Sequence, residues 1–77
     1  MEMITYRGLS LELTVVGDTI NDRLSLECWD LSPDGGLWFT LTRGTEGPVT
    51  LVPAGREIPL DLLEQVAAIA GTELTEQ

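Results

Sequence analysis

The sequence contains no histidine and no lysine, and only one cysteine, one phenylalanine and one tyrosine among its 77 residues. Without histidine there is no imidazole to act as a general base or to bind zinc. The single cysteine, Cys28, excludes an intramolecular disulfide and a thiolate-rich metal site. The four basic residues are all arginines, too few for a face that neutralises phosphates. The sequence therefore predicts no enzyme activity, no cofactor, no metal site and no direct contact with nucleic acid.

Long apolar segments are also absent. No window of the chain approaches the roughly 18 apolar residues that a membrane span requires. The first residues lack the basic and then apolar pattern of a signal peptide. We therefore expect a cytoplasmic protein in which Cys28 is reduced, with no membrane partner. Because arginine is used without lysine, and glycine and alanine are plentiful, we expect a bacterial or phage source.

Carboxylates are what the chain has in excess. Thirteen acidic residues against four basic ones give a net charge of −9. The length fits one small domain over residues 1–77, and a hydrophobic content of 43% is too high for a disordered chain. The negative charge can serve solubility alone, or it can steer the chain toward a basic partner.

Apolar and polar residues alternate with period two through the first two thirds of the chain, which is typical of strands with one buried face. This alternation predicts strands over about 3–16, 23–31, 37–43 and 48–53. From Pro59 to about Gly71 the apolar spacing changes to three and four, which predicts one helix over about 59–71. The expected fold is α+β, a four- to five-stranded antiparallel meander packed against one C-terminal helix.

The apolar residues of the first predicted strand change parity at Arg7-Gly8. Ile4 and Tyr6 are at even positions, whereas the apolar residues of the following segment are at odd positions. A β-bulge in one long strand would restore a single apolar face, and so would a tight hairpin between two strands. We favour the bulge, because arginine is a poor residue for the positive φ of a type I′ turn.

Loop lengths predict a register in which Leu11 pairs with Cys28, Cys28 with Leu41, and Leu41 with Leu51. One face of the sheet then forms the core, and the helix covers it with its own apolar stripe. The predicted members of that face are Leu9, Leu11, Leu13, Val15, Leu24, Leu26, Cys28, Phe39, Leu41, Val49 and Leu51. The predicted stripe of the helix is Leu60, Leu63, Val66, Ala70 and Leu74.

The opposite face is expected to carry an apolar patch. The same register places Leu31 opposite Trp38, with Trp29 on the diagonal and Val52 one strand away. Exposed tryptophan clusters often mark a binding surface. Alternatively, the N-terminal segment or the 53–58 connection covers the tryptophans, or the sheet curls and buries one of them.

The acidic residues on this face are expected to be solvated. Glu12 and Glu27 would lie directly opposite each other, but on an open sheet and without the cleft that a catalytic carboxylate pair needs. The loops around 18–22 and 30–35 lack the order of carboxylates in a calcium loop and are interpreted as turns. Cys28 is expected to be a small buried hydrophobe.

These features favour a non-enzymatic protein that binds and occupies a surface of a protein partner. The residues expected to contact it are the apolar Trp29, Leu31, Trp38 and Val52, and the acidic Glu12, Glu27, Asp61 and Glu64. One alternative is a phage or bacterial inhibitor of the anti-CRISPR, anti-nuclease or toxin-immunity type, which blocks a basic nucleic-acid-binding site. The other is a structural or assembly subunit whose tryptophan face makes homodimers.

Overall fold

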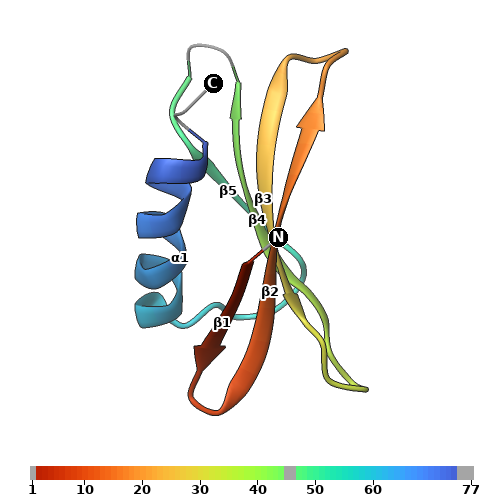
Figure 1. Cartoon of the computed structure of the whole chain (residues 1–77), viewed down its shortest axis with the longest axis vertical. Helices are drawn as coiled ribbons and strands as arrows, with labels where there is room; N and C mark the ends of the chain where they lie inside the picture. The colour runs from red at the N-terminus through yellow and green to blue at the C-terminus, as the bar shows by residue number, and fades with distance from the viewer. Residues whose placement is uncertain (1, 45–46, 75–77) are drawn as a thin grey trace.

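The computed structural model describes residues 2–44 and 47–74, which form a two-layer α+β domain (Figure 1). Five strands form one antiparallel meander in the order β1-β2-β3-β4-β5, and one helix lies along one face of it. The expected fold class is confirmed. The elements are β1 (Glu2–Tyr6), β2 (Leu9–Asp18), β3 (Arg23–Asp30), β4 (Gly36–Gly44), β5 (Thr50–Pro53) and α1 (Leu60–Glu73).

The first strand is a hairpin rather than one bulged strand, so the interpretation favoured from the sequence was wrong. Tyr6 pairs with Leu9 across the two-residue turn Arg7-Gly8. Both turn residues have positive φ, 48° at Arg7 and 84° at Gly8, as a type I′ turn requires. The Arg7 side chain donates to Asp61 in the first turn of α1, a tertiary contact that favours the hairpin.

The β2–β3 pairing is shifted by two residues from the predicted register. Leu13, not Leu11, pairs with Cys28, and Asp18 pairs with Arg23. The reason lies in the loop, where Asp18 Oδ1 accepts hydrogen bonds from the backbone N–H groups of Ile20 and Asn21 at 3.1 and 3.2 Å. This Asx turn shortens the loop and extends β2 to Asp18. A shift of two residues keeps every side chain on its predicted face.

The β3–β4 pairing is also shifted, and it contains a bulge that the sequence did not reveal. Cys28 pairs with Phe39 instead of Leu41, and the next pair is Trp29 with Leu37, which leaves Trp38 as the extra residue. The loop before β4 closes tightly at Gly35, where a Cβ atom would overlap the carbonyl group of Asp30. The predicted pairing of Leu41 with Leu51 is confirmed.

The core lies between the sheet and α1. The largest fully buried side chains of the sheet are Phe39, Leu11, Leu13, Leu26 and Cys28. The helix meets them with a stripe at every fourth residue, Leu62, Val66, Ala70 and Leu74. Leu62 therefore replaces the predicted Leu60, which is 70% exposed, and the helix continues past Gly71. Val15, Val49 and Leu51 have the predicted parity but are exposed, so the predicted core was too wide.

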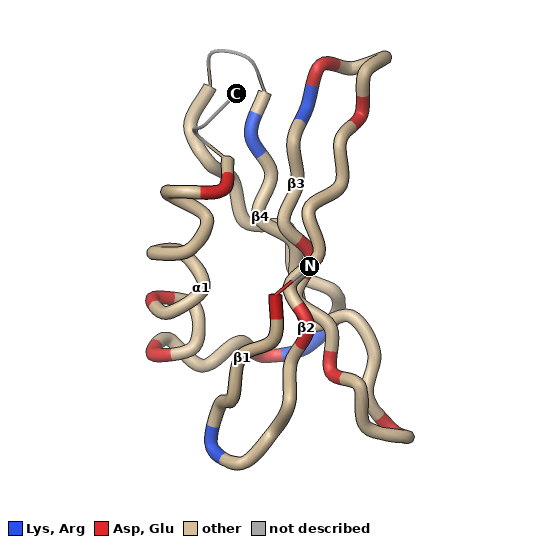
Figure 2. The backbone as a smooth tube through the Cα atoms, in the orientation of Figure 1, with Lys and Arg blue, Asp and Glu red and all other residues tan. Residues whose placement is uncertain are grey.

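The four arginines are spread over separate parts of the fold (Figure 2). Arg7 bonds to Asp61 at the start of α1, and Arg43 Nη1 donates to the carbonyl oxygen of Leu74 at its end, at 3.2 Å. This second contact places a cation where the helix dipole is negative, although the last turn itself has no basic residue. Arg23 lies opposite Asp18, and the guanidinium of Arg56 lies 4.9 Å from the ring centre of Trp38.

The described ranges 2–44 and 47–74 contain the helix α1 and no other. No helix there is both long enough and apolar enough to cross a bilayer.

Candidate functional site

The two tryptophans lie on opposite faces of the sheet, which divides the patch expected from the sequence. Trp29 pairs with Glu12 and Leu37, on the face without the helix. Trp38 packs against the buried core on the helix side. The bulge between β3 and β4 is the cause, because one extra residue in β4 turns Trp38 to the other face. The predicted pairing of Leu31 with Trp38 is therefore wrong.

Trp38 is covered by the connection between β5 and α1, one of the alternatives left open by the sequence. An open groove beside its ring is lined by Glu57, Ile58 and Pro59, and Arg56 lies over the ring. The indole N–H is buried and has no hydrogen bond of good geometry among the described residues. Trp38 is thus part of the packing of the domain.

Asp30 lies near this tryptophan and has a pKa below its ordinary value. The main cause is the backbone N–H of Ser32, which donates to Asp30 Oδ1 at 2.9 Å. The side chain of Ser32, the indole N–H of Trp38 and the charge of Arg56 contribute further. Asp30 therefore closes the β3–β4 loop as a carboxylate.

The face without the helix is called the open face below. The strand pairs show which side chains lie on this face, because paired residues share a face of the sheet. They form three rows across the sheet. The rows are Met3, Glu12, Trp29 and Leu37; then Thr14, Glu27, Thr40 and Val52; then Val16, Ser25, Thr42 and Thr50. These rows bring two carboxylates and one tryptophan together at the centre, surrounded by threonines and a few apolar side chains.

Glu12 and Glu27 are diagonal neighbours, so the prediction that they face each other directly was wrong. Glu12 pairs with Trp29, and Glu27 pairs with Thr14. Each carboxylate accepts a hydrogen bond from the same face: Trp29 Nε1 donates to Glu27 Oε1 at 3.0 Å, and Thr14 Oγ1 donates to Glu12 Oε1 at 3.1 Å. Both carboxylates are therefore oriented before any partner arrives.

The other predicted apolar contacts lie around this centre. Val52 belongs to the open face and is 48% exposed, and Leu31, just after β3, is 54% exposed. The contacts predicted from the sequence did not include Met3 and Val16, which are exposed on the same face, or the partly buried Leu37. The hairpin alternative would have placed Met3 on the open face, because the hairpin sets the parity of β1. The position of Leu37 on that face depends on the bulge in β4, which the sequence did not reveal.

The two predicted acidic contacts on the helix, Asp61 and Glu64, lie away from the open face. Asp61 is engaged within the protein. The Tyr6 hydroxyl donates to Asp61 Oδ1 at 2.7 Å, and Arg7 Nη2 donates to Asp61 Oδ2 at 3.0 Å. Arg7 Nε also donates to the Tyr6 hydroxyl oxygen at 3.0 Å. This cluster fastens the β1–β2 hairpin to the N-terminus of α1.

The hydrogen bond from Tyr6 is the main reason that the pKa of Asp61 lies below its ordinary value, and the hydrogen bond from Arg7 comes next. A carboxyl group with a lowered folded-state pKa stabilises the fold above its unfolded-state pKa of about 4, and the contribution is lost as the pH falls through the folded-state pKa. We therefore expect Asp61→Asn to lower the free energy of unfolding at pH 7, and the difference from the wild type to shrink steadily below about pH 4.

Urea unfolding at a series of pH values measures this difference. Glu64→Gln is the matched control, because it removes one carboxylate from the same exposed helix surface without breaking a hydrogen bond among the described residues. A loss of stability that is equal for both variants at pH 7 would contradict the role of the Tyr6–Arg7–Asp61 cluster.

Sites of chemistry are scarce. Cys28 is fully buried, and burial raises the pKa of its thiol to about 11, so it is a poor nucleophile at neutral pH. Among residues 2–44 and 47–74, no three metal-binding side chains gather in one place.

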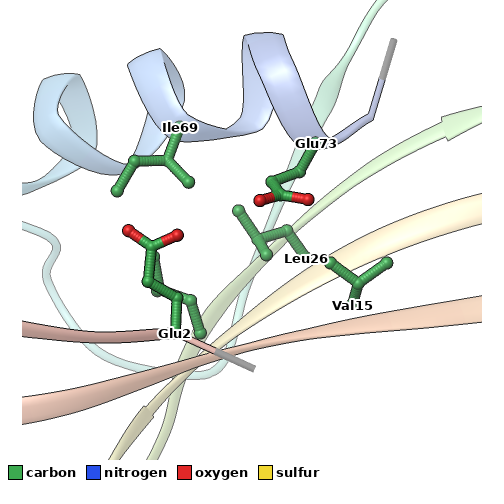
Figure 3. Close-up of a pocket in the computed structure, with 6 residues that line it drawn as sticks. Glu2, Val15, Leu26, Ile69 and Glu73 are labelled. Carbon is green, nitrogen blue, oxygen red and sulfur yellow. The ribbon is translucent and has the colours of Figure 1, made fainter. Parts of the chain in front are cut away.

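A cavity of about 60 Å³ lies between the start of β1 and the last turns of α1. Glu2 and Glu73 point into it, over Val15, Leu26 and Ile69 (Figure 3).

Comparisons with known proteins place this chain in no family. No protein-family model matches the sequence, and neither the curated proteins nor the solved structures give a match. Function must therefore be inferred from the surfaces of the chain itself.

Proposed function

We propose that this protein is a non-enzymatic binding protein of the cytoplasm that occupies a basic surface of a protein partner with its open face. The observation that carries this proposal is the centre of that face, where Glu12 and Glu27 flank Trp29. Carboxylates beside an aromatic ring suit a lysine or arginine side chain, because the ring attracts the cation and the carboxylate pairs with it.

Hydrogen bonding within the face supports the proposal. Trp29 and Thr14 hold the two carboxylates in place, so binding a partner costs less side-chain entropy. Arginines do not compete for these carboxylates, since Arg7, Arg43 and Arg56 contact other parts of the domain and Arg23 lies beside Asp18. The surplus negative charge is therefore available to an external cation.

The same charge disfavours a homodimer through the open face. Two copies stacked face to face would bring the Glu12 and Glu27 carboxylates of both copies into one interface that has no lysine. Like charges in such an interface cost binding energy. A basic partner is favoured instead, and an inhibitor that covers the nucleic-acid-binding site of a basic protein is one form that this function can take.

The proposal is tested with a partner captured from the native host on immobilised protein, identified, purified and then titrated. We expect the double variant Glu12→Gln and Glu27→Gln to raise the dissociation constant by about tenfold or more, since it removes two charged contacts. We also expect the wild-type association rate to fall steeply with added salt.

Glu57→Gln with Glu64→Gln is the matched control, because it removes the same charge from exposed residues outside the open face. An equal loss of affinity in both double variants would mean that only the net charge matters. Unchanged affinity in the Glu12 and Glu27 variant would show that the partner binds elsewhere.

A further inference from the structure

The outer edge of the sheet at β5 is exposed along its whole length. All four residues of β5 are exposed, and the strand is last in the order of the sheet. Its two apolar aliphatic side chains are exposed, Leu51 at 39% and Val52 at 48%, and so is Val49 just before the strand, at 41%. A free edge of this kind can pair with another strand.

The hydrogen-bond pattern shows which backbone groups this edge offers. Ala54 N donates to the carbonyl oxygen of Trp38 at 3.3 Å, so Ala54 belongs to a pair that is bonded to β4. Bonded and non-bonded pairs alternate along an antiparallel ladder. Thr50 and Val52 therefore bond to β4, and the N–H and C=O groups of Leu51 point outward. Pro53 also falls at an outward position, where its missing N–H costs no bond to β4.

This edge is complementary to itself. When a second copy of β5 is placed antiparallel with Leu51 opposite its own counterpart, each Leu51 N–H can donate to the Leu51 carbonyl oxygen of the other copy. Thr50 then lies opposite Val52, and Val49 opposite Pro53. Residues of equal parity meet, so the helix side and the open face each continue across the junction.

The distribution of charge favours a second copy at this edge over the other edge of the sheet. Neither β4 nor β5 contains a carboxylate, and residues 47–56 contain none either. The opposite edge, β1, begins with Glu2 and pairs with the strand that carries Glu12. Two copies of a chain with net charge −9 therefore meet with the least repulsion along β5.

We propose that β5 is a dimerisation edge, at which two copies of this chain pair antiparallel around Leu51 into one continuous sheet. The two helices then lie on one side of that sheet, and the two open faces lie together on the other. The pairing is independent of any partner of the open face. It would present two copies of that face to a repetitive or symmetric target, which strengthens binding through multivalency.

The test compares two proline variants of the full chain by sedimentation equilibrium over a range of concentrations. Leu51→Pro removes an outward donor from β5 while leaving the bonds to β4 in place. Met3→Pro is the matched control. The Tyr6–Leu9 pair that closes the hairpin is bonded, and pairs alternate along the ladder, so the Met3–Glu12 pair, three pairs further on, is non-bonded and the Met3 N–H points outward. We expect Leu51→Pro to raise the dimer dissociation constant by about tenfold or more and Met3→Pro to leave it unchanged.

Amide hydrogen exchange of the wild-type protein gives a second readout that requires no variant. The Leu51 amide is expected to become protected as the protein concentration rises, whereas the Thr50 and Val52 amides are protected at every concentration by β4. A wild-type protein that stays monomeric, or a Leu51 amide whose exchange ignores concentration, would overturn the proposal. Dissociation by Met3→Pro but not by Leu51→Pro would overturn it in favour of the β1 edge.

Discussion

Replacing Leu26 by alanine is expected to lower the free energy of unfolding by about 2–5 kcal/mol. Leu26 lies in the middle of β3, is 1% exposed, and belongs to the cluster on which α1 packs. Removing its side chain takes away buried apolar surface and leaves a void that neighbouring strands cannot close, because their register holds them in place. In a domain of this size that loss is a large share of the total stability.

Leu31→Ala is the matched control, since it makes the same chemical change at a residue that is 54% exposed, one position after β3. Urea unfolding should give a change within about 0.5 kcal/mol for this variant. If the two variants lose equal stability, or Leu26→Ala is close to neutral, the helix does not cover the face that contains Leu26.

Trp38→Asp is expected to lower the free energy of unfolding by about 3 kcal/mol or more. The substitution removes an indole that packs against the core, and it deprives Arg56 of the ring over which it lies. It also places a carboxylate close to Asp30, whose pKa is already influenced by the Trp38 indole N–H. Two carboxylates near each other in a partly buried position repel and lose solvation.

Trp29→Asp is the comparison variant, because Trp29 lies on the open face and its indole N–H bonds only to Glu27 in the described chain. Thermal unfolding followed by circular dichroism should show a much smaller loss for Trp29→Asp. Light scattering on the same two variants gives their oligomeric state, so a loss of stability is distinguished from a change in assembly. Equal melting temperatures for the two variants would mean that Trp38 does not contribute to the core.

The contrast between these tryptophans marks the limit of inference from the sequence. Their positions in the chain predict strands, and their alternation with apolar neighbours places both on the open face. One extra residue in β4 changes that result for Trp38 alone. A bulge leaves no local signal here, because Leu37, Trp38 and Phe39 are all apolar and each can face the core.

Registers were harder to predict than faces for a related reason. The β2–β3 register depends on side-chain bonds of Asp18 within its loop, and the β3–β4 register on the close approach of Gly35 to Asp30. A polar loop sequence permits several loop lengths that differ by two residues, and a shift of two preserves the faces. Glu12 and Glu27 were therefore placed on the correct face but next to the wrong partners.

The sequence by itself determined the class of fold, the buried position of Cys28, and the shortage of groups for catalysis, because these follow from composition and from the period of apolar residues along the chain. Tertiary structure decided which residues meet. It turned Trp38 inward, tied Asp61 to Tyr6 and Arg7, and assembled Glu12, Glu27 and Trp29 on one surface. Such contacts join residues far apart in the chain, so they depend on turn geometry and packing, which a local pattern does not contain.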